Sequence, residues 1–163
     1  MWIERVESPI GEIVLVGEED ALVSLDFGDC DERLRTWLER RYGSVDRARR
    51  EGTPAASVVS AYFDGDLDAL DSLAVQPRGT DFQQQVWREL RKVRAGRTVS
   101  YGELAARIGA PQASRPVGMA NARNPIALVV PCHRVIGSNG KLTGYAGGLD
   151  RKLWLLRHEG AMI

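Results

Sequence analysis

Alternation of apolar and polar positions predicts three short β-strands at the start of the chain. They span residues 2–6, 12–16 and 21–27. Turn-forming runs separate them, first Ser8-Pro9-Ile10-Gly11 and then Gly17-Glu18-Glu19-Asp20. Short strands joined by such turns favour an antiparallel meander.

Apolar residues then recur at helical spacing. The pattern predicts a helix over residues 31–42 and a second, shorter one over 58–63. Residues 64–79 are rich in Asp and Leu and end in Gln76-Pro77-Arg78-Gly79, which favours a boundary. The sequence therefore predicts an α+β protein whose N-terminal supporting domain, residues 1–77, is a small antiparallel sheet with helices.

The second domain, residues 78–163, is predicted to be mostly helical. Thr80 or Asp81 caps a helix that carries an apolar stripe as far as Val93 and ends at Ala95-Gly96. Ser100 and Glu103 have the form of a capping box, in which each side chain bonds the backbone amide of the other residue. They open a short helix that ends at Ile108.

Gly109-Ala110-Pro111 follows that helix, and a second short helix covers residues 114–121. The pair has the form of a helix-turn-helix. Pro116 lies within the first turn, where a missing amide has little effect. The final helix is predicted to be capped near Asp150 and to direct three residues inward: Leu149, Leu153 and Leu156.

Charge divides the chain at the same place. Residues 1–77 hold 8 Arg and 17 Asp plus Glu, giving −9, and residues 78–163 hold 14 Lys plus Arg and 5 Asp plus Glu, giving +9. A basic half predicts a polyanionic partner, and the acidic half should face away from that partner. The alternative is that the two halves attract one another.

Cysteine use and overall composition exclude several classes. With 163 residues and 44% apolar residues the chain can form one core or two small ones. Cys30 and Cys132 lie far apart, and no Cys/His cluster appears, so we expect neither a disulfide framework nor a metal site. The N-terminus lacks the pattern of a signal peptide, and no stretch is long and apolar enough to span a membrane. We expect a cytoplasmic protein without membrane association.

Candidate chemistry centres on Cys132 and His133, which adjoin an apolar, strand-like stretch from Asn124 to Val130. Only a thiolate is an effective nucleophile, and a free thiol titrates near pH ~8.5, so a neighbouring imidazole is what would activate it. The alternative is a buried structural cysteine. Cys30 lies among acidic residues that raise a thiol pKa, so we expect it to be unreactive.

Several motifs from Gly79 to Gly160 together resemble the O6-alkylguanine-DNA alkyltransferases, also called methylated-DNA-protein-cysteine methyltransferases. They include Gly79-Thr80-Asp81-Phe82-Gln83, Thr98-Val99-Ser100-Tyr101-Gly102, Ser114-Arg115-Pro116-Val117-Gly118, Pro131-Cys132-His133-Arg134-Val135, Gly144-Tyr145-Ala146-Gly147-Gly148 and Leu155-Leu156-Arg157-His158-Glu159-Gly160. Residues 1–77 match that family only in length and strand-rich pattern.

The resemblance implies direct reversal of DNA damage. The thiolate of Cys132 would take the alkyl group from O6 of guanine irreversibly and once per molecule, without a cofactor. His133 would draw the thiol proton through a bridging water, and Glu159 would orient the imidazole. Asn124 would hold the turn that carries the cysteine, and Tyr101 would donate a hydrogen bond to the departing base.

The resemblance also assigns the substrate contacts. Val135, Tyr145 and Ala146 would border the pocket for the base, which must first turn out of the duplex. Arg115 would fill the gap left in the base stack. The residues assigned to DNA contact by the helix-turn-helix are Arg115, Ala120, Asn121, Ala122 and Arg123, together with Tyr101.

The predicted partner is double-stranded DNA containing O6-alkylguanine, with O4-alkylthymine as a further candidate substrate. We expect a monomer and leave cooperativity on DNA open. The alternatives are a transcription regulator, a Cys-His hydrolase of small molecules and a non-catalytic binder of alkylated DNA. The short second helix offers few base-edge donors for a regulator. A small-molecule hydrolase has no use for the basic half, and a non-catalytic binder in this family would lack Cys132.

Overall fold

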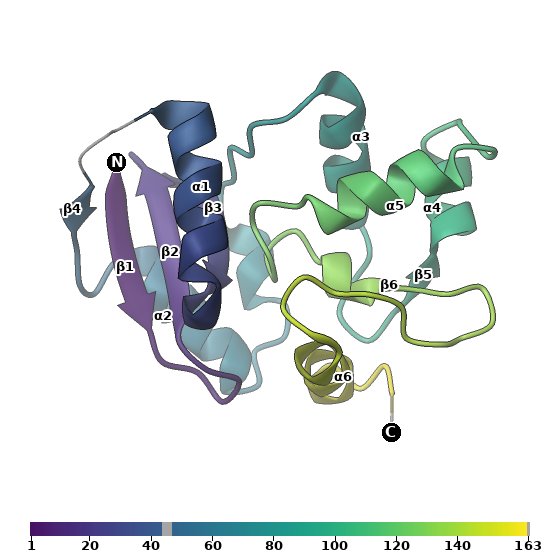
Figure 1. Ribbon diagram of the computed structural model, residues 1–163. Helices are drawn as coiled ribbons and strands as arrows, with labels where there is room; N and C mark the ends of the chain where they lie inside the picture. Colours follow the sequence, from purple (N-terminus) through teal and green to yellow (C-terminus); the bar gives the residue numbers. More distant parts are fainter. Residues whose placement is uncertain (44–46, 163) are drawn as a thin grey trace. The chain divides into compact units, whose positions relative to one another are not determined.

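The computed structural model describes residues 1–43 and 47–162. It divides into two compact units, Met1–Arg78 and Gly79–Ile163. Figure 1 shows an α+β chain in which the four-stranded sheet belongs to the first unit, while the second unit consists of helices, loops and one pair of two-residue strands. The α+β class predicted from the sequence is therefore confirmed.

The first unit is built on a sheet of order β3-β2-β1-β4. Strands β1 (Trp2–Val6), β2 (Ile13–Glu18) and β3 (Ala21–Phe27) pair antiparallel, as the meander pattern predicts. The short strand β4 (Ala48–Arg49) pairs parallel with β1 and was not predicted. Both of its side chains are exposed, so its two residues carry no alternation to detect.

Helices cover both faces of this sheet (Figure 1). The helix α1 (Asp31–Tyr42) contributes Leu34 and Leu38 to a buried cluster with three sheet residues, Val14, Val16 and Val23. The helix α2 (Pro54–Phe63) begins four residues earlier than predicted. Its start is fixed by Thr53, whose hydroxyl accepts from the Ala56 amide at 3.2 Å, and by Pro54 in the first turn.

A buried carboxylate joins strand β1 to the start of α2. Glu4 accepts hydrogen bonds from the amides of Gly52 and Thr53, at 2.8 and 3.1 Å, and from the Thr53 hydroxyl at 2.6 Å. A buried charge is tolerated when hydrogen bonds replace its water, which these three bonds do. Glu4 therefore ties strand β1 of the sheet to the N-terminus of α2.

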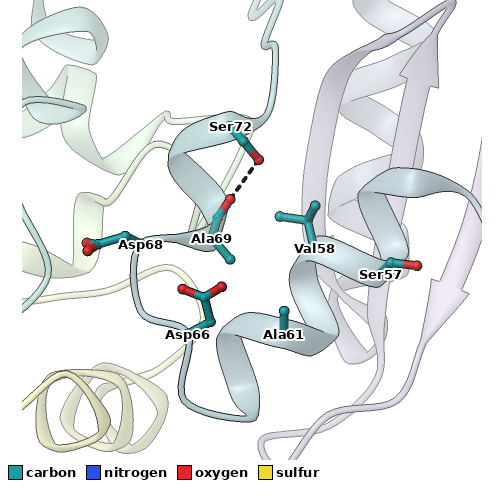
Figure 2. Close-up of a pocket in the computed structure, with 7 residues that line it drawn as sticks. All are labelled: Ser57, Val58, Ala61, Asp66, Asp68, Ala69 and Ser72. Atoms are coloured by element: carbon teal, nitrogen blue, oxygen red, sulfur yellow. Dashed lines mark hydrogen bonds between the residues drawn. The ribbon is translucent and has the colours of Figure 1, made fainter.

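An open hollow in the first unit lies between α2 and the 3-10 turn η2 (Ala69–Ser72), as Figure 2 shows. It has a volume of about 420 Å³ and is lined by Asp66, Asp68, Ser57, Ser72 and three small apolar residues. The Ser72 hydroxyl donates to the Ala69 carbonyl at 2.8 Å. Two carboxylates without a cation in the lining would repel a polyanion, so this hollow is not a nucleic-acid site.

The second unit begins with α3 (Asp81–Leu90), which Thr80 and Gln83 open as a full capping box. The helix ends at Leu90 rather than at Ala95-Gly96, because Arg91–Val93 form turns instead of a further helical turn. Val99–Ser100 form β5, which pairs parallel with β6 (Val135–Ile136).

Helices α4 (Tyr101–Arg107) and α5 (Ser114–Ala122) form the expected helix-turn-helix. The predicted capping box of Ser100 and Glu103 is confirmed by both of its hydrogen bonds, at 3.1 and 3.3 Å. Gly109 lies in the turn with φ +78°, a backbone conformation that other residues adopt only with strain. Pro116 falls in the first turn of α5 as predicted.

The last helix, α6 (Leu149–His158), only partly turns the predicted face inward: Leu156 is buried as predicted, and Leu153 is half-buried. Leu149 is 49% exposed, and the buried side chains of the segment are Lys152, Leu155, Leu156 and the following Glu159. Its N-terminus at Gly148 has no side-chain cap, so the predicted cap near Asp150 was wrong as well. The apolar pattern misled because two positions on the buried face hold charged residues.

Candidate active site

Cys132 opens the 3-10 turn η3 (Cys132–Arg134), directly before β6. It is a free thiol, 7% exposed, and its backbone amide donates to the Val130 carbonyl at 2.8 Å. The side-chain amide of buried Asn121, on α5, donates to the Cys132 carbonyl at 3.4 Å. Backbone contacts on both sides thus fix the position of the cysteine.

The apolar stretch before Cys132 is a folded loop and not the predicted strand. Asn124 closes it: its side-chain amide donates to the Val130 carbonyl at 2.7 Å, and its oxygen accepts from the Ile126 amide at 3.0 Å. Within the loop, buried Leu128 has φ +69°. The continuous apolar run reflects burial on all sides, which period alone cannot distinguish from a core strand.

A buried ionic network surrounds His133. Its Nε2 lies 2.8 Å from Oε2 of Glu159, which directly follows α6. Arg134 donates to the same carboxylate, from Nε to Oε1 and from Nη2 to Oε2, both at 2.9 Å, and its Nη1 donates to the Val93 carbonyl at 2.6 Å. All three charged or ionisable side chains are buried. The fold thus brings together residues 26 positions apart in the sequence.

This network fixes the protonation of the imidazole. Burial alone would raise the pKa of Glu159, but the hydrogen bonds from His133 and Arg134 hold that pKa far below its usual range. A carboxylate only accepts, so Nε2 of His133 carries the proton. Burial lowers the pKa of His133 against the opposing effect of Glu159, and its ring is therefore neutral.

The other ring nitrogen of His133, Nδ1, is the atom that can accept a proton. In a neutral ring with Nε2 protonated, Nδ1 is a bare acceptor. Nδ1 is buried and has no hydrogen-bond partner among the described residues. A neutral imidazole with an unoccupied lone pair next to a cysteine in the chain can serve as a general base.

Tyr101 and the three residues assigned to the base pocket lie in three places. Tyr101 starts α4 and is half-buried, and its hydroxyl hydrogen bonds with Oγ1 of Thr143 at 2.7 Å. Val135 is buried in β6. Tyr145, half-buried, and Ala146, exposed, belong to the loop between β6 and α6.

The helix α5 presents only some of the residues assigned to DNA contact. Arg115 and Ala122 on the helix and Arg123 at its end are exposed. Ala120 and Asn121 are buried, so their side chains are not presented to solvent, and their assignment to DNA contact stays a prediction. The carbonyl of Ala120 accepts from the indole of Trp87 at 2.9 Å, which makes this side of α5 part of the core.

Two further side chains escaped the sequence analysis. Arg134 stands inside the Pro-Cys-His-Arg-Val motif, and Lys152 lies three and four positions before Leu155 and Leu156 on α6. Both are buried. A charged residue on the apolar face of a predicted helix is the signal that could have revealed Lys152.

The described part of the chain offers neither a cluster of metal ligands nor a membrane-spanning helix. No group of three or more His, Cys, Asp or Glu side chains among residues 1–43 and 47–162 is arranged to hold a metal ion. No helix within the same ranges is long and apolar enough to cross a membrane. Cys30 is half-buried, and burial together with Asp26 and Asp29 raises its pKa, as expected of an unreactive thiol.

Sequence comparison matches both units to one family. Residues 3–77 match the ribonuclease-like domain of 6-O-methylguanine DNA methyltransferase, and residues 81–161 match the DNA-binding domain of the same family. The methylated-DNA-protein-cysteine methyltransferase of Methanosarcina barkeri is 47% identical over 98% of this chain and 97% of its own length. The Shigella flexneri protein of that name is 42% identical over 98% of this chain and 96% of its own.

Solved structures agree with this assignment. The crystal structure of Mycobacterium tuberculosis O6-methylguanine methyltransferase is 42% identical and matches with a TM-score of 0.81, covering 98% of this chain and 93% of that one. The crystal structure of Mycobacterium tuberculosis OGT in complex with DNA is 38% identical, with a TM-score of 0.80 and coverage of 99% and 94%. The chain therefore belongs to the 6-O-methylguanine DNA methyltransferase family, whose function is direct reversal of DNA alkylation by transfer of the alkyl group to a protein cysteine.

Proposed function

We propose that Cys132 is the alkyl acceptor and that the substrate is O6-alkylguanine in double-stranded DNA. The sulfur forms a bond to the alkyl carbon while the bond from that carbon to O6 breaks. The thiol loses one proton and the released guanine gains one, so charge balances without a cofactor. The observation that carries the proposal is the buried Cys132, whose thiol is not in a disulfide, followed directly by a neutral histidine whose Nε2 is held by an ionised glutamate.

Proton removal from Cys132 is the role of His133. Its Nδ1 would receive the thiol proton through a bridging water, and the ring would become an imidazolium. Glu159 lies 2.8 Å from Nε2 and stabilises that charge as it forms. Arg134 keeps Glu159 ionised and aligned through its two hydrogen bonds. Asn124 sets the path of the loop that ends at the nucleophile.

Departure of the base is the role of Tyr101. Its hydroxyl would donate to the guanine as negative charge develops there, which lowers the barrier for a poor leaving group. Val135, Tyr145 and Ala146 would border the base. Ala146 contributes its backbone amide toward O6.

Delivery of the base requires the nucleotide to leave the duplex, because Cys132 is only 7% exposed. Exposed Arg115 at the start of α5 would fill the space left in the stack, and Ala122 and Arg123 would lie against the groove and backbone. The net charge of +9 on residues 78–163 favours phosphate contacts of this kind. O4-alkylthymine presents the same ether chemistry and is a second candidate substrate.

We further propose a monomer and a cytoplasmic location. Each of the groups assigned to the reaction lies in a single chain, and the acceptor must stay a reduced thiol until it meets DNA. Both cysteines are free thiols, which a reducing compartment preserves.

The test is the mass of the intact protein after incubation with a duplex that contains one O6-methylguanine. We expect one added methyl group per molecule, mapped to the peptide that holds Cys132. The matched variant Cys132→Ser should gain no mass, and Cys30→Ser should behave like the parent. An unchanged parent mass, with the protein folded and the oligonucleotide in excess, would overturn the proposal.

A further inference from the structure

Lys152 is a buried cation to which the proposed reaction gives no role. It is 0% exposed although it lies on α6 within four residues of the helix start. Removing an ammonium group from water is unfavourable, and a positive charge near a helix N-terminus opposes the helix dipole. Neither the core nor the helix gains from a charge at this position. A buried lysine at this position therefore requires a contact that uses its charge.

Hydrogen bonds through Thr143 connect Lys152 to Tyr101. The Nζ atom of Lys152 donates to the Thr143 carbonyl at 2.9 Å. Oγ1 of the same Thr143 hydrogen bonds with the Tyr101 hydroxyl at 2.7 Å. Two consecutive hydrogen bonds, both involving Thr143, therefore connect α6 to the first residue of α4.

Thr143 lies outside regular secondary structure, so no helix or strand hydrogen bonds fix its backbone. It lies in the loop between β6 and α6, which begins with a tight turn in which the Gly137 amide donates to the Lys141 carbonyl at 2.9 Å. After that turn the residues to Gly148 form no helix or strand. A buried donor at the far end of the loop is what fixes the Thr143 backbone, and through it the hydroxyl that meets Tyr101.

Lys152 also lies within electrostatic range of the nucleophile. Charge on Cys132 raises the pKa of Lys152, although burial lowers it overall to about 8, and Lys152 contributes to the lowered pKa of His133. Such coupling is mutual, so a positive Lys152 favours a negative sulfur.

We infer that Lys152 is a positioning residue for alkyl transfer: it holds Thr143 so that the Tyr101 hydroxyl points at the departing base. This inference rests on the proposed function, in which Cys132 attacks and Tyr101 donates. Lys152 itself touches neither the alkyl group nor the base.

The experiment is single-turnover methyl transfer from duplex DNA, measured by intact mass against DNA concentration. Lys152→Met keeps the length of the side chain and removes the charge and the donor. We expect the saturating rate to fall about 10- to 100-fold, as for a displaced catalytic group. The DNA concentration at half-saturation should stay within about twofold, because Lys152 is buried away from solvent. An unchanged rate, or a loss confined to DNA affinity, would overturn the inference.

The melting temperature of Lys152→Met distinguishes a positioning role of Lys152 from a structural one. Replacing a buried charge by an apolar side chain of similar size is often neutral or stabilising, so Lys152→Met should melt at or above the temperature of the parent. A loss of rate that merely follows a loss of folded protein would count against the inference. Exposed Lys92 offers the matched control, since Lys92→Met removes the same charge from the surface and should leave the saturating rate unchanged.

A double-mutant cycle tests the route through Thr143. Tyr101→Phe should slow the parent strongly but slow Lys152→Met much less, because the hydroxyl is already misplaced there. Additive losses would overturn this route.

A second pair of variants tests the same step even if Lys152→Met fails to fold. Thr143→Val keeps the backbone carbonyl and removes the hydroxyl contact with Tyr101, and Thr143→Ser restores that contact. If the parent takes up no methyl group, the proposed function fails. If the parent and Lys152→Met react alike, only this inference fails.

Discussion

Arg134 binds the Glu159 carboxylate with two parallel hydrogen bonds, Nε to Oε1 and Nη2 to Oε2, each 2.9 Å long and each buried. Planar guanidinium and carboxylate groups fit each other in this geometry, which adds direction to the attraction between their charges. Glu159 can then orient His133 without rotating.

Breaking this buried pair should cost both stability and rate. For Glu159→Gln we expect a loss of about 3–5 kcal/mol in the free energy of unfolding, because Arg134 keeps its charge without a partner. Urea denaturation measures it. Methyl transfer should slow as well, since the amide stabilises an imidazolium less well. Exposed Asp150→Asn is the control and should change stability by less than about 0.5 kcal/mol. Equal stability of the two variants would contradict the prediction.

Acid should destabilise the fold through His133 and Glu159. Burial lowers the pKa of His133 from its ordinary 6.5, so below that pH the unfolded chain binds a proton that the folded chain excludes. The pKa of Glu159 is held below its ordinary 4.5, with the same consequence below that pH. The free energy of unfolding should therefore fall as pH drops from about 7 to about 4.

Urea midpoints across that range measure the effect. The variant His133→Gln lacks the titrating ring and should lose the upper part of the slope, between about pH 6.5 and 5. His158 stacks on Trp154 with ring centroids 4.7 Å apart, is only half-buried and takes no part in the buried network of His133 and Glu159. His158→Gln should therefore keep the slope. A parent midpoint that does not move with pH would refute the assignment of a neutral, buried His133.

Asn124→Ala should loosen the loop before the nucleophile. The change leaves the Val130 carbonyl and the Ile126 amide without their side-chain partner, and each unpaired buried group costs about 1–3 kcal/mol. Cys132 follows two residues after Val130, so methyl transfer should slow as well. Thermal melting and single-turnover rates measure the two effects. Asn139→Ala, in an exposed turn, is the matched control, and equal losses at both positions would contradict the prediction.

Arg115→Ala should impair repair of duplex DNA more than repair of a single strand. Only the duplex has a stack that must be filled when the base leaves, so the ratio of the two rates should fall. Salt titrations of affinity for unmodified duplex provide a second measurement: the slope should stay unchanged in Arg115→Ala, since only loss of a phosphate contact reduces it by about one. Exposed Arg35→Ala, in the acidic unit, should change neither. An equal loss on both substrates would favour a simple phosphate contact.

Local signals in the sequence predicted most of the fold. Strands β1 and β3 and helix α1 have the predicted bounds, because alternation and helical spacing depend on neighbours in the chain. Strand β4 was missed, since its pairing with β1 is made by backbone groups some 46 residues apart and leaves no side-chain pattern. The inward face of α6 was predicted only in part, for Leu156, because Lys152 and Glu159 occupy buried positions where apolar residues are expected.

The residues of the candidate site likewise divide into those that the sequence revealed and those that only the fold brings together. Cys132 and His133 were found because they are adjacent, and Glu159 and Tyr101 because their motifs resemble a family. Lys152 and Thr143 were missed because their connection exists only once α6 and the loop before it are folded. The burial of Asn121 likewise depends on how α5 packs in its unit, which no single helix can reveal.

Leu128 shows that the loop before Cys132 is locally frustrated. Its left-handed backbone suits glycine or asparagine, while its buried side chain needs an apolar residue, and no natural amino acid satisfies both demands. A sequence selected for stability alone would resolve that conflict by changing the path of the loop. The chain instead tolerates it four residues before its nucleophile. Efforts to make this protein more heat-resistant should therefore leave residues 124–130 alone and begin with the surface of the first unit.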